Sequence, residues 1–494
     1  MRLFFFGTLL VLLILSVIAW SIQPRVENDG KIPLVWVSDD NPARRDQLDL
    51  FNTLNPSCRL RLDPGNGAME KVIVQSLGGV GPDLFDCYDG FQLSAYVRSG
   101  VAWDVTDALK ARNVDIGTIW PPLQQYVMYD GRVYGFGTNL SADAIWYNKA
   151  IFDAEGVPYP NGPWTWDQFI PLAQKMTKRD ASGRITQYGF MCEWWNWLHY
   201  VYQFGGRVYT PDGTRCVVDS PETIAGVQLL HDLIYKYHVT PSPVEEAAMA
   251  TQGGWGSGSI TRFGAGKAAM ALGGRWWLCT LRDYKDLKLG VAESPYARTR
   301  IFRAYGKATL VNRHSPRREE ALRFLQYQAT HEYNDLINSQ ADGIGPVVRD
   351  TYSDTFLHNP RFPQEDQNAV WREAALHSQS DQVSPYINGQ TASRIINKQL
   401  DLVKNDQKSP EEAMRAAARQ INAEIAKALQ QDPSLRQHYE QRVKLSINTP
   451  YSRPNGRLAV RNRAAIWDQQ SSLDGVFITP DPALPAQRTA GGAR

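Results

Sequence analysis

Residues 130–156 constrain the fold of this 494-residue chain more than any other segment. The pair Asp130-Gly131 is typical turn chemistry between two aromatic-rich runs, so residues 126–129 and 133–136 are predicted to form a hairpin. Residues 144–148 are predicted to form a strand, and the apolar spacing after them indicates a short amphipathic helix. The segment is therefore a connector that leaves one folded unit and begins another.

Length and composition narrow the possible classes of protein. At roughly 150 residues per domain, a chain of 494 residues forms two or three units. The net charge of +2 is too small to attract nucleic acid, and no basic run interleaved with aromatics precedes the C-terminal tail. The sequence contains fifteen tryptophans, and their flat apolar faces must contact either a ligand or the protein core. Sugar rings are one answer and core packing is the other.

The N-terminal residues predict export. Residues 3–22 form an uncharged apolar run, close to the ~20 residues that span a bilayer. Small residues at Ala19 and Ser21 also suit cleavage of a secretory signal. Residues 1–22 are therefore expected to be a cleaved signal peptide, or a membrane anchor if uncleaved. Either way, the protein is expected in the periplasm or on the extracellular face of the cytoplasmic membrane.

Enzyme and metal signatures are missing from the sequence. The five cysteines include no C-x-x-C pair and are expected to be small buried hydrophobes. H-E-x-x-H and G-x-S-x-G are absent, and the eight histidines have no obvious ligand spacing, so no metal or cofactor is expected. A glycosidase needs only two carboxylates across a cleft, so Glu193 with Asp40 or Asp89 leaves that alternative open.

The first strand and helix place a polar loop at a sheet edge. Residues 31–38 are predicted to form a buried strand, and residues 44–54 an amphipathic helix. The loop between them holds Asp39 and Asp40 at the carboxyl end of the strand, where open α/β sheets bind ligands. Capping of the helix is the alternative role for these two carboxylates.

Several motifs distributed over residues 31–430 resemble those of extracellular solute-binding proteins, the carbohydrate-binding family that serves ABC importers and includes maltose-binding-type proteins. The matching motifs are the 130–156 connector with its strand ending Tyr147-Asn148-Lys149, the Gly-rich turn before Pro82-Asp83, the Thr165-Trp166-Asp167 helix start, and the Phe263–Met270 run followed by Gly274-Arg275-Trp276. They are spread along the chain rather than clustered, which favours membership of that family.

The resemblance implies an α/β, periplasmic-binding-protein-like fold of two lobes with hinge strands and an interlobe cleft. Lobe 1 would comprise residues 31–138 plus 297–345, and lobe 2 residues 139–296 plus 346–430. Residues 31–138 and 139–296 are expected to have separate sheets. Residues 431–494 depart from the family and are expected to be an irregular extension. We expect a monomer that binds a carbohydrate and delivers it to the membrane permease subunits of an ABC transporter.

The resemblance also implies a ligand site. Its expected residues are Asp40, Tyr88 and Asp89 from lobe 1, and Glu193, Trp195, Arg275, Trp276 and Tyr386 from lobe 2. Aromatic rings would stack on the sugar faces, the carboxylates would accept hydroxyl protons, and Arg275 would supply a forked donor. Three tryptophans among residues 194–197 cannot all face one core, which independently favours exposure of at least one of them, and the resemblance points to Trp195. A membrane-tethered sugar sensor without an importer is the alternative function.

Overall fold

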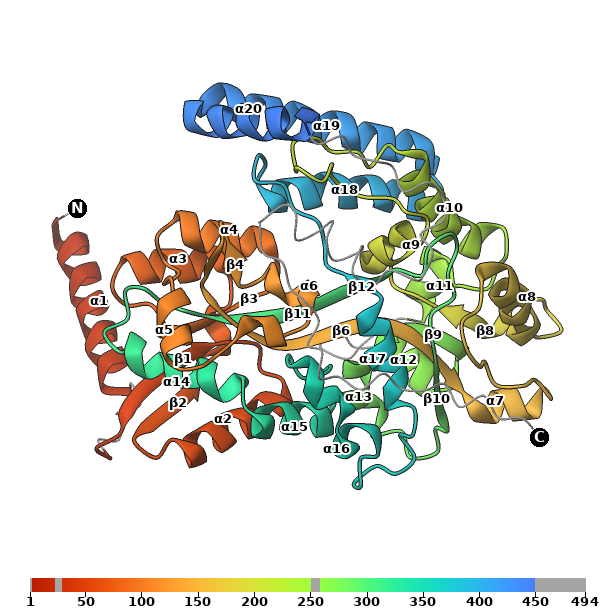
Figure 1. Ribbon diagram of the computed structural model, residues 1–494, viewed down its shortest axis with the longest axis horizontal. Coiled ribbons are helices and arrows are strands. Elements are labelled where there is room, and N and C mark those ends of the chain that lie inside the picture. The colour runs from red at the N-terminus through yellow and green to blue at the C-terminus, as the bar shows by residue number, and fades with distance from the viewer. Residues whose placement is uncertain (1, 23–28, 250–257, 449–494) are drawn as a thin grey trace.

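The computed structural model describes residues 2–22, 29–249 and 258–448. Figure 1 shows two groups of helices and strands joined by two long strands, β6 and β11. The strands are β1 (Ile32–Val37), β2 (Cys58–Leu62), β3 (Leu84–Cys87), β4 (Met128–Tyr129), β5 (Arg132–Val133), β6 (Gly135–Asn148), β7 (Lys178–Arg179), β8 (Ile185–Met191), β9 (Ala268–Gly274), β10 (Leu289–Ala292), β11 (Phe302–Val311) and β12 (Ser378–Gln379).

Helices precede, separate and follow these strands. They are α1 (Arg2–Ile22), α2 (Pro42–Leu54), α3 (Met69–Leu77), α4 (Gly90–Arg98), α5 (Thr106–Ala111), α6 (Pro121–Gln124), α7 (Lys149–Ala154), α8 (Trp166–Met176), α9 (Trp197–Gln203), α10 (Pro221–Tyr235), α11 (Pro243–Ala248), α12 (Ser259–Gly264), α13 (Leu278–Leu281), α14 (Arg318–Gln328), α15 (His331–Gln340), α16 (Asp354–Leu357), α17 (Asn368–Leu376), α18 (Gly389–Lys404), α19 (Pro410–Gln431) and α20 (Pro433–Asn448). Short 3₁₀ turns include η3 (Trp194–Asn196), η4 (Arg275–Trp277) and η5 (Val348–Tyr352).

One hydrogen-bonded sheet runs through both groups, in the order β2-β1-β3-β11-β6-β9-β8-β7, with β10 on β6 and β12 on β11. The first part of β6 pairs with β11, and its last part pairs with β9 and β10. The expectation of separate sheets for residues 31–138 and 139–296 is therefore wrong. A strand of 14 residues is long enough to serve both groups, so the chain crosses between them without leaving the sheet.

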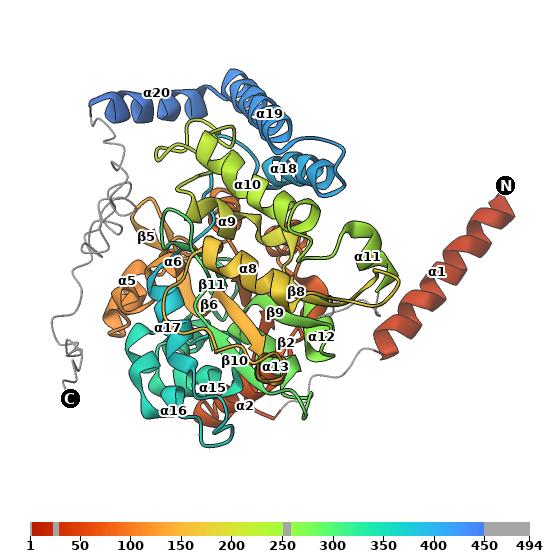
Figure 2. The same ribbon diagram turned by 90° about the vertical axis from the view of Figure 1, so that its right-hand side faces the viewer.

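Three apolar clusters hold the helices against the sheet. The largest extends across both groups and includes Trp36 of β1 and Trp146 of β6, whose ring lies 4.9 Å from that of Trp371. A second cluster lies among α8, α9, α10, α18 and α19, and a third joins α3 and α4 to the sheet. Figure 2 shows α10, α18 and α19 side by side over one end of the molecule.

The predicted connector forms as expected, with adjusted bounds. Strands β4 and β5 make the hairpin, and Asp130 and Gly131 both adopt positive φ at its turn. The strand predicted for residues 144–148 is the end of β6, and Asn148 caps α7 through its side-chain oxygen. The strand and helix around residues 31–54 are confirmed as β1 and α2. Strand β2 was not predicted, because its alternating Arg59 and Arg61 mask a short apolar pattern.

The two ends of the chain differ from their predictions in part. Residues Arg2–Ile22 are helical, and no helix among the described residues meets the length and apolarity that a membrane crossing requires. A secretory signal stays a prediction. At the other end, residues Pro433–Asn448 form α20, so an irregular extension from residue 431 is wrong for that part. Residues 449–494 lie outside the described residues.

Candidate functional site

A row of polar and aromatic side chains runs along β11 between the two groups of elements. Arg303, Tyr305 and Lys307 occupy alternate positions of the strand, so they point to the same face of the sheet. On the neighbouring strand β6, Ser141 lies opposite Tyr305 in the register. Because β11 passes through both groups, the row reaches from one to the other.

Lys307 anchors the row in the first group. Its ammonium is 3% exposed and donates to Ser38 Oγ and Asp86 Oδ2, at 2.8 Å each, and to Asp39. Asp39 follows β1 and Asp86 lies in β3, so these carboxylates meet at the carboxyl ends of adjacent parallel strands. Burial would raise the pKa of Asp39, but Lys307 and Arg44 hold it well below its ordinary value.

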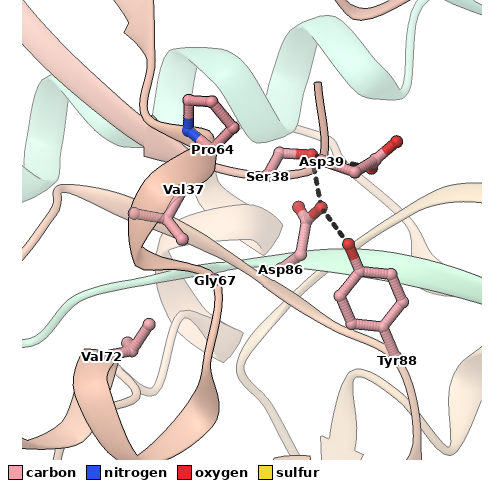
Figure 3. A pocket seen from close by; sticks show the side chains of 8 residues that line it. All are labelled: Val37, Ser38, Asp39, Pro64, Gly67, Val72, Asp86 and Tyr88. Atoms are coloured by element: carbon pink, nitrogen blue, oxygen red, sulfur yellow. Dashed lines mark hydrogen bonds between the residues drawn. The ribbon is translucent and has the colours of Figure 1, made fainter. Parts of the chain in front are cut away.

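A pocket of about 190 Å³ opens beside these carboxylates (Figure 3). Ser38 Oγ and the Tyr88 hydroxyl both donate to Asp86 Oδ2, at 2.5 and 3.3 Å. The Tyr88 residue is 41% exposed. Typical ligand pockets hold about 300–1,000 Å³, so this space suits one small polar ring or one end of a longer ligand. Its lining residues are Val37, Ser38, Asp39, Pro64, Gly67, Val72, Asp86 and Tyr88.

The other end of the row presents an exposed indole. Trp195 is 49% exposed, and its ring meets that of Tyr305 edge to face with centroids 5.4 Å apart. The Arg303 guanidinium lies 5.1 Å from the centre of the Trp195 ring and forms a bidentate pair with Asp381 at 2.6 and 2.7 Å. The ring is thus fixed from two sides while one part stays open to solvent.

Trp276 reaches the same tyrosine from η4. Its indole nitrogen donates to the Tyr305 hydroxyl at 2.9 Å, and that hydroxyl donates to Asp143 Oδ1 at 2.9 Å. A side chain at Gly274 would lie 2.2 Å from Ser141 Oγ and 2.7 Å from both Trp276 and Tyr305, so only glycine permits this close approach. Trp276 is half-buried. The row therefore combines aromatic faces with fixed hydrogen-bonding groups.

Comparisons with known proteins identify this arrangement. The sequence profile of the family described as bacterial extracellular solute-binding protein matches residues 43–335, more than half of the chain. The chain belongs to this family of solute-binding proteins. An arabinooligosaccharide-binding protein from Bacillus subtilis is 24% identical over 307 residues, which cover 59% of this chain and 68% of that relative.

Solved structures support the fold of this solute-binding protein. An ABC substrate-binding protein from Listeria monocytogenes in complex with cycloalternan has a TM-score of 0.69 at 22% identity, covering 80% of this chain and 99% of that one. UgpB from Mycobacterium tuberculosis in complex with glycerophosphocholine has a TM-score of 0.66 at 15% identity, covering 81% and 99%. The predicted two-lobed α/β fold is confirmed, and the family is one of binding proteins, not of enzymes.

The structure of this solute-binding protein brings three of the predicted site residues to the β11 row. Tyr88 lies beside Lys307, whose ammonium is 5.8 Å from the centre of the tyrosine ring. Trp195 and Trp276 both contact Tyr305. Their contacts with a ligand stay predictions.

Two predicted carboxylates have other bonds in this structure. Asp89 caps α4 by accepting from the backbone nitrogen of Gln92 at 2.7 Å, and burial raises the pKa of Asp89. Glu193 precedes η3 and accepts from the backbone nitrogen of Ser259 at 3.0 Å. Their roles as acceptors for a ligand stay predictions.

Asp40 does not line the pocket. Its side chain is 50% exposed and lies 3.6 Å from Arg45. The preceding Asp39 lines the pocket instead, which corrects the prediction by one residue. Capping was also assigned to the wrong residue, because Asn41 accepts from the backbone nitrogen of Ala43 at the start of α2.

Arg275 is structural. Arg275 is 1% exposed, and its three guanidinium nitrogens donate to Asn368 Oδ1, Gly343 O and Asn338 O at 2.7–2.9 Å. Those two carbonyls belong to the end of α15 and to the loop after it, so the arginine caps that helix. The prediction of a forked donor for ligand hydroxyls is wrong, because the side chain is buried and each of its nitrogens already donates to the protein.

Tyr386 is buried beneath α20. It is 1% exposed, its hydroxyl lies 3.0 Å from His438 Nδ1, and its ring meets Tyr439 edge to face at 5.0 Å. A stacking platform at the cleft mouth is therefore wrong for this residue. The unpredicted helix α20 supplies the contacts that bury it.

Sequence reasoning missed Arg303, Tyr305, Lys307 and Asp143. A signal was present in the alternation of Arg303, Tyr305 and Lys307 within an otherwise apolar strand. Polar side chains on every second residue of a strand mark one face that is not packed against apolar core. Asp143, at the same spacing on β6, carried a similar signal.

Proposed function

We propose that this protein captures a neutral carbohydrate along the β11 row and delivers it to the membrane permease of an ABC importer. The observation that carries the proposal is the pair of exposed rings, Trp195 and Tyr88, at the two ends of a row of fixed polar groups. Sugars offer C–H faces that stack on such rings and hydroxyl rims that need fixed donors and acceptors. The B. subtilis relative, an arabinooligosaccharide-binding protein, supports the same class of ligand.

The charges of the site favour a neutral ligand over a phosphodiester. Lys307 is bonded to two carboxylates, Arg44 to Asp342 at 2.6 Å, and Arg303 to Asp381. A phosphate recognised here would have to displace one of these ion pairs, because each cation is already matched. Carboxylates also outnumber the three cations around the row: they are Asp39, Asp86, Asp143, Asp342 and Asp381. The excess of negative charge would repel an anionic ligand.

A binding assay separates the two ligand classes. We expect an arabino-oligosaccharide or a cyclic gluco-oligosaccharide to raise the melting temperature, because a ligand at 100 times its Kd stabilises the native state by about 2.7 kcal/mol. Glycerophosphocholine at the same concentration is expected to leave it unchanged. Isothermal titration then gives the Kd. Stabilisation by glycerophosphocholine alone would overturn the proposal of a neutral ligand.

The lobe boundaries are part of this proposal. Residues 31–138 with 297–345 would form one lobe, and residues 139–296 with 346–430 the other, with bending near residues 138, 296 and 345, where the chain passes from one lobe to the other. A ligand held between two half-sites gains contacts to both only when they approach. We expect the radius of gyration from small-angle scattering to decrease when the sugar identified above is added. An unchanged radius would indicate a rigid site.

Export, the permease contact and a monomeric state complete the proposal. The family is described as extracellular, which supports a location outside the cytoplasm. A periplasmic location, a cleaved or retained segment 1–22, and binding as a monomer rest on the sequence. Fractionation of cells and light scattering of the purified protein test these three points.

A further inference from the structure

A fully buried carboxylate lies directly beneath the aromatic part of the row. Asp143 of β6 is 0% exposed, so no ligand touches it. Its Oδ1 accepts from the Tyr305 hydroxyl at 2.9 Å, and its Oδ2 accepts from the Asn196 amide at 2.5 Å. Both acceptor oxygens are therefore used by donors from two other elements, β11 and η3.

The two partners of Asp143 contact the two tryptophans of the row. Tyr305 receives the indole N–H of Trp276 and meets the ring of Trp195 edge to face. Asn196 follows Trp195 in η3, and its side-chain oxygen accepts from Arg303, which lies over the Trp195 ring. Each indole is thus linked to Asp143 through one intervening residue, which is Tyr305 for Trp276 and Asn196 for Trp195.

We propose that Asp143 is a positioning residue for carbohydrate binding, which holds Trp276 through Tyr305 and Trp195 through Asn196. This inference rests on the proposed function and adds a residue to it. The chain of bonds has one direction, since Trp276 donates to Tyr305 and Tyr305 donates to Asp143. The carboxylate accepts from both donors through two oxygens, whereas a neutral asparagine at this position offers one oxygen and one amide N–H and so loses one of the two acceptors.

Protonation of Asp143 would remove the same acceptor. Burial, followed by the nearby Asp381, raises the pKa of Asp143 to about 6, while Asn196, Tyr305 and Arg303 oppose the rise. His199 also faces it, with Nδ1 4.0 Å from Oδ2, but burial lowers the pKa of His199 to about 3 and keeps it neutral. Binding that depends on the carboxylate should therefore weaken as the pH falls through about 6.

The stability of the ligand-free protein should change with pH in the opposite direction to the affinity for the ligand. The folded state holds the proton of Asp143 more tightly than the unfolded chain, whose ordinary pKa is 3.8. The contribution of this group to stability is thus largest below that value and is lost as the pH rises through about 6. Asp143→Asn is accordingly expected not to lower the melting temperature at pH 7.5, whereas a residue with only a structural role would lower it.

The test measures affinity and tryptophan signals of Asp143→Asn and of wild type between pH 5 and 8. We expect the variant to bind the sugar about tenfold more weakly at pH 7.5 and to lose the wild-type decline in affinity below pH 6. The matched control is Asp83→Asn. Asp83 is also a buried carboxylate, 1% exposed, but it lies at the start of β3, at the opposite end from Asp86, and it accepts from Val35 N at 2.8 Å. We expect its affinity to be that of wild type.

A ligand-free measurement separates this inference from the proposed function. The near-ultraviolet circular dichroism of wild type is expected to change with a midpoint near pH 6, and the change should vanish in Asp143→Asn and in the double variant Trp195→Phe/Trp276→Phe. If no carbohydrate binds but this titration is present, the proposed function fails, and what stands is that Asp143 holds the two indoles in place. Unchanged affinity in Asp143→Asn, or a titration that survives it, would overturn the positioning role.

Discussion

Trp195→Ala is expected to weaken carbohydrate binding about thirtyfold while the ligand-free protein keeps its melting temperature. The indole is 49% exposed, so removing it disturbs little packing in the absence of ligand. Covering roughly 40 Å² of the ring with a sugar face contributes about 1 kcal/mol, at ~25 cal/mol per Å². Stacking geometry adds about 1 kcal/mol by analogy with aromatic pairs. A sum of about 2 kcal/mol corresponds to about thirtyfold in Kd.

Trp103→Ala is the matched control for this substitution. Trp103 is a half-buried indole that, like Trp195, has an arginine over its ring, since Arg318 lies 5.2 Å from its centre, but it sits beyond the far end of β11. Its removal should leave the Kd unchanged. Trp195→Phe should recover most of the affinity, because a flat ring remains. A Trp195→Ala protein with wild-type Kd and a much lower melting temperature would show that the residue packs the protein and does not touch the ligand.

Much of the fold could be predicted because its signals are local. Strand β1 and helix α2 lie within two residues of the predicted 31–38 and 44–54, since short apolar runs and helical spacing are read within a few residues. The continuous sheet could not be predicted in this way. Whether β6 ends at a lobe boundary depends on its pairing with β11, which lies more than 150 residues further along the chain.

The site was predicted less completely, because the charged residues that pair there are far apart in the sequence. Lys307 meets Asp39 across 268 residues, and no pattern near either residue reports that contact. Trp195 and Tyr88 were predicted as ligand contacts through the family resemblance, and only the three tryptophans within residues 194–197 gave a local signal as well. Arg275 and Tyr386 were misassigned because the residues that hold them are distant in the sequence. Arg275 is held by Asn338 of α15, which lies 63 residues further along the chain, and Tyr386 by His438 of α20, which lies 52 residues further along.

Lys307→Met is expected to lower the free energy of unfolding by about 3–5 kcal/mol at pH 7, the cost typical of removing one partner from a buried ion pair. The ammonium and Asp86 are each 3% exposed, so the carboxylate would keep its charge without a counterion. Methionine retains most of the side-chain volume but removes the ammonium that lies over the rings of Trp36 and Tyr88. Urea unfolding measures the loss. The same substitution at Lys178, whose pair with Glu155 is 40% and 28% exposed, should cost less than about 1 kcal/mol.

The pH dependence of that loss identifies its cause. In wild type, Lys307 and Arg44 hold the pKa of Asp39 below its ordinary value against the effect of burial, so this group stabilises the fold above pH 4 and ceases to do so as the pH falls. In Lys307→Met the buried Asp86 loses its ammonium partner and penalises the fold above pH 4, while Asp39 keeps only its pair with Arg44. Both effects make the difference between the proteins large at pH 7, and the part due to Asp39 should decline only as the pH falls below the ordinary carboxyl value of 3.8. Asp86→Asn added to Lys307→Met should restore part of the stability, because the amide oxygen can still accept from Trp36 Nε1, as Asp86 does at 2.8 Å. A loss that does not vary with pH would mean that packing of the lysine stem, and not its charge, stabilises this end of the row.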